Sequence, residues 1–351
     1  MPGRTGTRSI ARSGPSRIQD VASAAGVSTA TVSRALRGLD RVSPDTRARV
    51  MAAAADLHYV ASPHASSLKS GKTGIVGVVV PFFTRWFFAQ LIEGAEACLR
   101  EQGYNLLVFN IGNRGHERTR VIDRGLLGKR FDGLLVLSAD LDPPEVDLLR
   151  QLHLPIVTVG LDLASYDHVG IDDVETADLA MSHLLALGHT RIAYVGGNPA
   201  EDVHVATAVD RMAGVRRALR RAQVSTDRRL MVHADWTLRG GLAAGLRLLD
   251  RPDPPTAILA ASDEMAIGVL CAARQRGVDV PGSLSVMGID DHEMSFTHDL
   301  STVRQPVAQQ GCSAAALLLD ALAGRAPHHR RDVILPTVVV QRGSTAPASA
   351  P

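Results

Sequence analysis

Acidic pairs are the residues of this chain whose type and spacing could support catalysis. Asp172-Asp173 and Asp290-Asp291 supply paired carboxyl groups, which glycoside hydrolysis requires. Neighbouring residues on a strand or loop point apart, however, and neither a nucleophile nor a proton donor can be assigned to either pair. The sequence therefore predicts that the protein is not an enzyme.

Histidines and cysteines show no pattern of a metal or cofactor site. The 13 histidines are scattered, without an HExxH motif or a Cys/His quartet. Cys98, Cys271 and Cys312 are too few and too far apart for a disulfide scaffold or a CxxC site. We expect no metal, no cofactor and three reduced thiols that pack as small hydrophobic side chains.

Charge is distributed unevenly along the 351 residues. Residues 1–72 hold 11 Lys and Arg against 4 Asp and Glu, whereas the other 279 residues hold 27 against 32. A basic segment of net charge +7 before a body of net charge −5 predicts a polyanionic partner for that segment. The chain has no run of 18 apolar residues and no apolar leader, so we expect no membrane span and a cytoplasmic location.

Three short helices are predicted in the basic segment, after an arm that we expect to be disordered. Apolar residues repeat at helical spacing over 18–25, and Gly26 ends this helix. Ser28 can cap a second helix over 29–36, and Ser43 can open a third. Two helices joined by a three-residue turn that contains glycine form a helix-turn-helix.

Beyond residue 72, short apolar strands alternate with helical segments. This alternation predicts parallel sheets with helices on both faces and a ligand cleft at the carboxyl ends of the strands. The expected strands are 74–80, 105–110, 133–138, 156–159, 169–171, 191–196, 229–233, 257–260 and 285–289. The clearest helical patterns are 87–102, 117–128 and 176–187.

The segment 20–34, DVASAAGVSTATVSR, resembles the DNA-binding head of the LacI/GalR family of bacterial transcription regulators. The resemblance extends through DEMAIG at 263–268 and GIDD at 288–291, and it covers residues 17–345. It implies an all-α helix-turn-helix head plus an α/β two-lobed periplasmic-binding-protein-like effector domain. The implied divisions are an arm 1–16, a head 17–60, a hinge 61–72, an effector-binding and dimerisation domain 73–345 and a tail 346–351. Within that domain, lobe 1 is expected at 73–167 and 306–335 and lobe 2 at 168–305 and 336–345, with crossings near Asp167, Gln305 and Leu335.

The resemblance also implies which residues contact DNA. The base-reading positions of the second helix correspond to Thr29, Ala30 and Arg34, and Arg34 can hydrogen-bond a guanine edge in bidentate fashion. Phosphate contacts are expected from Thr31, Ser33 and Ser43. Arg37 stands where the family usually has Asn, and we expect it to contact a phosphate as well. In the hinge, Leu68 stands where the family's wedge leucine enters the minor groove, and Lys69 would lie beside phosphates.

An effector site between the lobes is implied as well. The matching positions and strand-end loops contain Arg85, Trp86, Phe88, Asp172, Arg211, Trp236, Ser262 and Asp290. Arginine and aspartate bind vicinal hydroxyls, and an indole stacks on the CH face of a sugar. We therefore expect a sugar or sugar derivative, although Gly160, where the family often has Asp, leaves the ligand class open.

The expected function is that of a homodimeric repressor, which its effector releases from a pseudo-palindromic operator. A purine-like co-repressor or a controlling protein partner are alternatives within the family. A solute-binding protein without DNA function is disfavoured by the intact Arg34 and by the lack of a secretory leader. The sequence has no leucine-heptad extension, so a tetramer of that kind is not expected.

Overall fold

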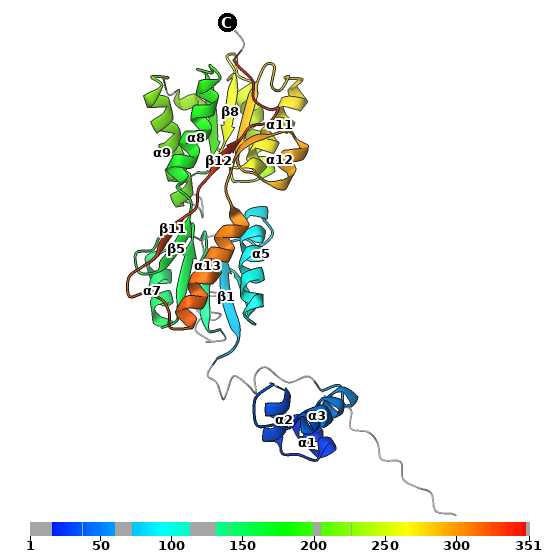
Figure 1. Cartoon of the computed structure of the whole chain (residues 1–351). Helices are drawn as coiled ribbons and strands as arrows, with labels where there is room; N and C mark the ends of the chain where they lie inside the picture. The colour runs from blue at the N-terminus through cyan, green and yellow to red at the C-terminus, as the bar shows by residue number, and fades with distance from the viewer. Residues whose placement is uncertain are drawn as a thin grey trace, which may run out of the picture. The chain divides into compact units, whose positions relative to one another are not determined.

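The structure of the chain is a computed structural model (Figure 1). It describes residues 16–36, 38–59, 72–112, 131–139, 141–198, 205–225 and 227–348. The chain divides into two compact units, Met1–Thr73 and Gly74–Pro351. The helix expected at 117–128 lies outside the described residues.

The first unit is a bundle of three helices around a small apolar core. Val21, Val32 and Val50 come from different helices and are fully buried. Gly26 ends the first helix with a φ of 64°, a left-handed conformation that costs glycine little. The helices are α1 (Ile18–Ala25), α2 (Thr29–Leu36) and α3 (Pro44–Asp56). The expected helix-turn-helix is confirmed.

The second unit contains two six-stranded sheets, each forming one lobe. In lobe 1 the strand order is β11-β5-β4-β3-β1-β2 and every pairing is parallel. Its strands are β1 (Ile75–Val80), β2 (Asn105–Asn110), β3 (Gly133–Leu137), β4 (Ile156–Val159), β5 (Asp167–Gly170) and β11 (Asp332–Ile334). Its described helices are α5 (Trp86–Glu101), α7 (Pro143–Gln151) and α13 (Val307–Leu322).

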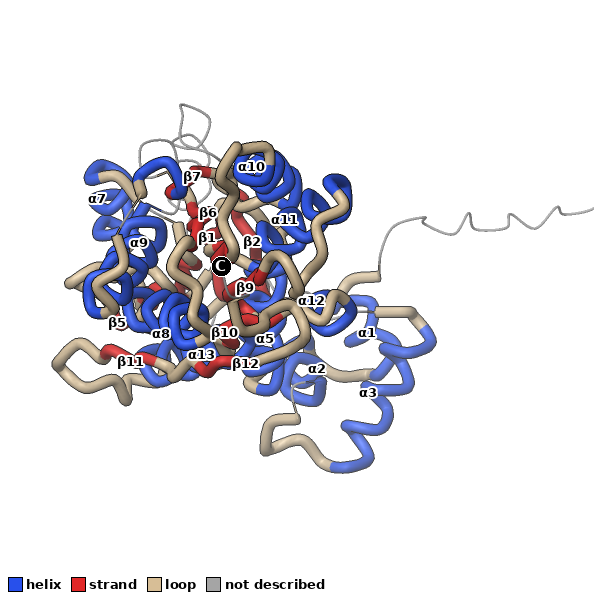
Figure 2. Tube along the Cα trace, turned by 90° about the horizontal axis from the view of Figure 1, so that it is seen from above, coloured by secondary structure: helices blue, strands red, loops and turns tan. Residues whose placement is uncertain are grey.

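Lobe 2 repeats this layered arrangement with one antiparallel strand at its edge. The strand order is β12-β10-β9-β8-β6-β7, and only the pair β10–β12 is antiparallel among the described strands of this sheet. Its strands are β6 (Ile192–Gly196), β7 (Met231–His233), β8 (Ala257–Ala260), β9 (Ser285–Asp290), β10 (Ser301–Arg304) and β12 (Val338–Val340). Its helices are α8 (Asp173–Ala186), α9 (Val205–Arg221), α10 (Leu238–Leu249), α11 (Asp263–Arg276) and α12 (Glu293–Thr297), with a 3-10 turn at Arg228–Leu230. Figure 2 shows helices of the second unit on opposite sides of the central strands, as expected for sheets covered on both faces.

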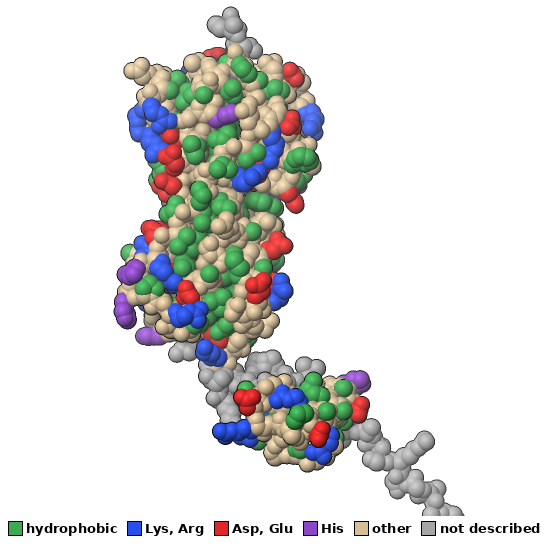
Figure 3. Space-filling model, viewed as in Figure 1, with side chains coloured by type: hydrophobic (Ala, Val, Ile, Leu, Met, Phe, Trp, Pro, Cys, Tyr) green, Lys and Arg blue, Asp and Glu red, His purple; other side chains and the backbone are tan. Residues whose placement is uncertain are grey.

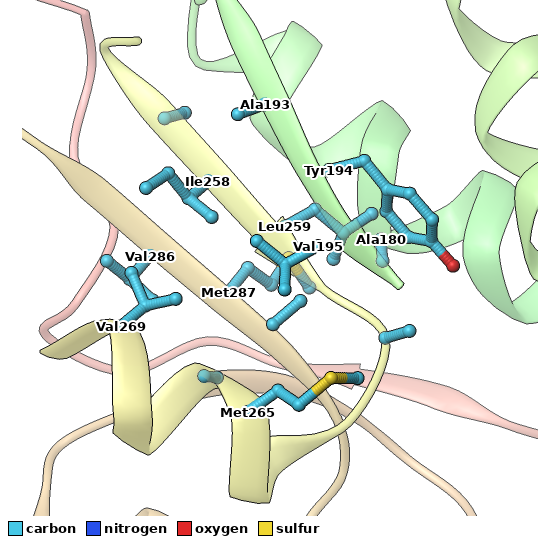
Figure 4. Packing of buried hydrophobic residues seen from close by; sticks show 14 of the residues in the cluster. Ala180, Ala193, Tyr194, Val195, Ile258, Leu259, Met265, Val269, Val286 and Met287 are labelled. Atoms are coloured by element: carbon cyan, nitrogen blue, oxygen red, sulfur yellow. The ribbon is translucent and has the colours of Figure 1, made fainter. Parts of the chain in front are cut away.

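Aliphatic side chains form the core of lobe 2. Ile258, Leu259, Val286 and Met287 are fully buried on the central strands β8 and β9, and Figure 4 shows them packed together. Tyr194 is 1% exposed and projects from β6 on the side of Ala180 of α8. A largely aliphatic core agrees with the low aromatic content of the chain, which is 4%.

The chain passes between the lobes three times. The first passage follows β5, because Asp167–Gly170 pairs within the sheet of lobe 1 and α8 begins in lobe 2. The structure therefore places this passage after Gly170 and not near Asp167. The other two lie between β10 and α13 and between β11 and β12.

Helices α5 and α13 pack against each other at unusually short range. A Cβ on Gly94 would lie 2.0 Å from the carbonyl oxygen of Ala308, so the glycine permits this approach. A disulfide joins Cys98 of α5 to Cys312 of α13. The expectation of three free thiols was therefore wrong. Cys98 and Cys312 are 214 residues apart in the sequence, but the fold brings them together, and Cys271 is free.

The side chains on one face of the molecule are mixed in character. In the second unit, Figure 3 shows Lys and Arg interspersed with Asp and Glu, and hydrophobic side chains along the middle of this face. Ile334 of β11 and Val338 of β12 are about half exposed, at 50% and 51%. No helix among the described residues is long and apolar enough to span a membrane.

Candidate functional site

Helix α2 of the first unit presents the expected base-reading residues to solvent. Thr29, Ala30 and Arg34 are all exposed, whereas Val32 and Ala35 on the other side of the helix are buried. The apolar side therefore anchors the helix, and the exposed side is available to a groove of DNA. Arg34 is the residue of this face that can make a bidentate contact with guanine.

The hydroxyls expected at phosphates also stabilise helix starts. The Ser28 hydroxyl accepts the backbone N–H of Thr31 at 3.2 Å and lies 3.0 Å from the Thr31 hydroxyl. Ser43 caps α3, because its Oγ accepts the Thr46 N–H at 3.3 Å. Ser33 is half-buried. Arg37, Leu68 and Lys69 lie outside the described residues.

A cavity lies between the two lobes of the second unit. It is lined by both lobes and by two of the connections between them. The lining residues are Arg85, Trp86, Phe87, Phe88, Ser138, Gly160, Ile171, Asp173, Thr207, Arg211, Trp236, Ser262, Glu264, Asp290, Gln305 and Gln310. Seven of the eight expected effector residues are among them.

The remaining expected residue, Asp172, is not part of this lining. Its carboxylate caps α8 by accepting the Glu175 N–H at 2.8 Å. The next residue, Asp173, lines the cavity in its place. The sequence could not show which of these two neighbours lines the cavity, because that depends on the residue at which α8 begins.

Arg211 is a buried cation in the wall of the cavity. It is 4% exposed, and its Nε donates to Asp173 Oδ1 at 2.7 Å. Its Nη1 donates to the carbonyl oxygen of Ala261 and lies 3.9 Å from Asp290 Oδ1. Burial opposes the charged form, but the neighbouring carboxylates outweigh it and keep the pKa of Arg211 raised.

Asp290 ends β9 and links Arg211 to the connection between the lobes. Its Oδ1 accepts the Gln305 Nε2–H at 2.6 Å, and the Gln305 Oε1 accepts the Gln310 Nε2–H at 2.9 Å. This chain of hydrogen bonds runs from lobe 2 to α13 of lobe 1. Burial raises the pKa of Asp290 to about 8, although Arg211 opposes the shift.

A second buried carboxylate, that of Asp263, lies next in sequence to the lining residue Ser262. It accepts hydrogen bonds from the His292 N–H at 2.8 Å and from the hydroxyls of Ser295 and Thr302, each at 2.7 Å. Burial raises the pKa of Asp263 to about 6 despite these donors. Asp263 therefore orders the turn after β9, while its neighbour Ser262 lines the cavity and caps α11.

Both tryptophans of the chain line the cavity, one from each lobe. Trp236 of lobe 2 is 9% exposed, and the Arg211 guanidinium lies 5.8 Å from its ring centroid. Trp86 of lobe 1 lies 4.7 Å from the ring of His292. Phe88 is 2% exposed and also belongs to the core of lobe 1, so only part of its side chain can face a ligand.

Several lining residues were not anticipated from the sequence. Gln305 and Gln310 carry no charge and stand in no motif, so only their position at the lobe connection reveals them. At Gly160, φ is 69° and a Cβ would lie 2.3 Å from Ser138 Oγ. Ser138 therefore occupies the space in which a side chain at 160 would lie. Among the described residues, no group of three His, Cys, Asp or Glu side chains could hold a metal ion.

The fold and the cavity together define a class of protein. A helix-turn-helix unit is joined to a two-lobed α/β unit that carries a polar and aromatic cavity at the carboxyl ends of its strands. This is the architecture of a ligand-binding transcription regulator.

Comparison with known proteins identifies the family. Residues 17–62 match "Bacterial regulatory proteins, lacI family", and residues 181–345 match "Periplasmic binding protein-like domain". The HTH-type transcriptional repressor CytR of Escherichia coli (strain K12) is 34% identical over 313 residues, which are 88% of this chain and 90% of CytR. The chain belongs to the LacI family of bacterial regulatory proteins.

Solved structures of the same family resemble the chain over nearly its whole length. A lac repressor dimer bound to operator and the anti-inducer ONPF has a TM-score of 0.84 at 27% identity, covering 95% of this chain and 100% of that one. A complex of the transcriptional regulator CelR with cellobiose has a TM-score of 0.70 at 32% identity, covering 94% and 99%. These relatives are transcription regulators, not enzymes.

Proposed function

We propose that the protein is a homodimeric repressor, not an enzyme, that releases operator DNA when an uncharged, polyhydroxylated small molecule occupies the cavity between its lobes. It would act in the cytoplasm, on genes of carbohydrate metabolism. The observation that carries this proposal is the buried cluster of Arg211, Asp173 and Asp290 beside Trp236. Its hydrogen-bonding groups and indole suit a ligand with hydroxyls on its edge and an apolar face.

The charge of the cavity argues for an uncharged ligand. Three carboxylates, those of Asp173, Glu264 and Asp290, line the cavity together with the guanidinium groups of Arg85 and Arg211. Arg211 already pairs with two of these carboxylates, and Arg85 lies over the Phe82 ring at 4.1 Å. Both guanidinium groups thus already have partners, so a phosphorylated ligand would have to compete with these partners for the two cations. The bound cellobiose of the CelR complex is consistent with an uncharged sugar.

Release of the operator DNA follows if the ligand binds one arrangement of the lobes more tightly than another. A ligand can shift such an equilibrium only by its difference in affinity for the two states. Gln305 and Gln310 connect Asp290 to lobe 1, so a ligand hydroxyl that binds Asp290 would disturb this connection. Two heads in a homodimer would read the two half-sites of the operator, as the dimeric lac repressor complex suggests.

The DNA-binding part of the proposal is tested by selecting binding sites from random DNA with the full chain. The wild type should enrich one two-fold sequence, and Arg34→Ala should lose preference at one position of each half-site, by about 1–3 kcal/mol. Arg49→Ala is the matched control, because Arg49 is an exposed arginine of α3, outside α2. If Arg34→Ala selected the same sequence as the wild type, the assignment of the reading face would be wrong.

The effector part is tested by thermal unfolding with a panel of ligands. Uncharged sugars, including cellobiose and ribose, are compared with their phosphates and with purine bases and nucleosides. An uncharged sugar should raise the melting temperature of the wild type and not that of Asp290→Ala. A rise with a sugar phosphate alone would refute the uncharged class, and a rise with a purine alone would refute the polyhydroxylated class.

A further inference from the structure

Helix α2, which carries the expected base-reading residues, ends in a tight turn. Gly38 in this turn has a φ of 68°, a left-handed conformation. The Gly38 N–H donates to the carbonyl oxygen of Ala35 at 3.2 Å, and the Leu39 N–H donates to that of Arg34 at 3.1 Å. These two hydrogen bonds form a Schellman motif, which satisfies carbonyl groups that have no partner within the helix.

Arg47 of α3 binds the same turn from the neighbouring helix. Its Nη1 donates to the Ala35 carbonyl oxygen at 3.1 Å, and its Nη2 donates to the Leu39 carbonyl oxygen at 2.8 Å. A guanidinium group suits this place, because its planar fork directs two donors at two acceptors. The carboxyl end of a helix also attracts a positive charge. Arg47 therefore stabilises the end of α2 from outside that helix.

The backbone of Arg47 is fixed in the first turn of α3. Its N–H donates to the Ser43 carbonyl oxygen at 2.9 Å, and the Ser43 side chain caps this helix. Helix α3 contributes the fully buried Val50 to the core that the three helices share. Arg47 is half-buried, whereas Arg49 of the same helix is exposed. Arg47 thus connects the end of α2 to the core of the head.

Arg34 lies one hydrogen bond away from this contact. Leu39, whose carbonyl oxygen accepts Arg47, donates its own N–H to the Arg34 carbonyl oxygen. The other acceptor, Ala35, follows Arg34 directly in the chain. A helix of eight residues is marginally stable by itself, and helix ends fray. The contact of Arg47 therefore restrains the backbone from which the Arg34 side chain projects.

We propose that Arg47 is a positioning residue for DNA reading, which fixes the direction of Arg34 by holding the carboxyl end of α2. This inference rests on the reading face proposed above, and it adds a residue of another helix that binds protein backbone. A contact with a DNA phosphate is the alternative role of an arginine in this unit. The two roles differ in their effects on base preference and on salt dependence.

Hydrogen exchange of the full chain without DNA gives the first test. Arg47→Ala should speed exchange of the Gly38 and Leu39 amides about fivefold, as expected when about one net hydrogen bond is lost. Arg49→Ala is the matched control, because Arg49 is an exposed arginine of α3, and it should leave both amides unchanged. Unchanged exchange in Arg47→Ala would overturn the role of Arg47, whether or not the chain selects a DNA sequence.

Binding to DNA gives the second test. The probes are the duplex that the wild type selects and the same duplex with a replacement at the base pair where Arg34→Ala loses preference. Arg47→Ala should reduce the preference between them about fivefold, which is part of what a bidentate contact provides, without changing the slope of log affinity against log salt. A slope reduced by about one for each head, with the preference unchanged, would indicate a phosphate contact and overturn the proposal. A wild type that selected no sequence would instead overturn the reading face itself.

Arg47→Lys separates geometry from charge, and it decides the question if Arg47→Ala does not fold. Lysine keeps the positive charge but lacks the planar fork that reaches two carbonyl oxygens. It should therefore restore the base preference and the amide protection only in part, with the salt dependence of the wild type. Full restoration of both would overturn the proposal, because a positive charge alone would then be sufficient.

Discussion

Replacement of Arg211 by alanine should destabilise the second unit severely. The guanidinium is 4% exposed and lies between Asp173, at 2.7 Å, and Asp290, at 3.9 Å. The side chains of these two carboxylates are only 15% and 10% exposed. Without Arg211 the carboxylate of Asp173 loses its counter-charge, and the buried carboxyl of Asp290 loses the cation that lowers its pKa. Breaking a buried pair in this way costs about 3–5 kcal/mol, because an uncompensated charge remains.

This loss is large enough to measure by chemical and thermal unfolding. For a unit of this size, about 3–5 kcal/mol corresponds to a fall in melting temperature of about 6–20 °C. Arg229→Ala is the matched control, since Arg229 is 73% exposed and pairs with Asp227. A surface pair of this kind contributes about 0–1 kcal/mol.

The pH dependence of the Arg211→Ala effect gives a second check. Because the pKa of Asp290 is already about 8, this carboxyl is neutral at pH 6 with or without Arg211, and only Asp173 then loses a cation. The destabilisation should therefore be smaller at pH 6 than at pH 9. A loss below about 1 kcal/mol at both pH values would refute the reasoning, because it would show that the carboxylates find other partners or water.

Three further predictions concern Asp290, the cysteines and the cap of α3. Asp290→Asn should flatten the pH dependence of the free energy of unfolding between pH 6 and 8. Burial raises the pKa of Asp290 to about 8, so the wild type loses stability as pH rises through this range. An equal slope in the variant would contradict this assignment. One thiol per chain should react in denaturant without reductant, and three after reduction; three in both conditions would show that Cys98 and Cys312 are not paired. Ser43→Ala should destabilise the first unit by about 0.5–2 kcal/mol through loss of the α3 cap, as measured by the exchange of its amides, whereas Ser23→Ala, at an exposed position within α1, should not.

Local patterns in the sequence were sufficient to predict the head. Apolar spacing over 18–25, the break at Gly26 and the cap at Ser43 each depend on residues only a few positions apart. The alternation of strands and helices likewise predicted parallel sheets covered by helices, and the resemblance to LacI/GalR regulators implied the two lobes. The short strands β10, β11 and β12 were not predicted, because three or four residues carry too little pattern and their pairing is set by distant segments.

The cavity shows the same division between local and distant information. Arg211, Trp236 and Asp290 could be named because they match ligand-binding positions of the LacI/GalR family and follow predicted strands. Gln305 could be placed near a passage between lobes, but not within a hydrogen-bond relay. The pairing of Cys98 with Cys312 depends on contact between helices that are far apart in sequence, and no spacing rule reveals it.

Coupling between the cavity and the head is the central claim, and operator affinity measured with and without ligand tests it most directly. The assay is fluorescence anisotropy of the full chain on the DNA that it selects, titrated with the sugar that raises its melting temperature. We expect the sugar to weaken operator binding by the wild type at least tenfold, and to leave Asp290→Ala bound at every sugar concentration. If the sugar bound the wild type without changing its operator affinity, the protein would not be a repressor controlled through this cavity.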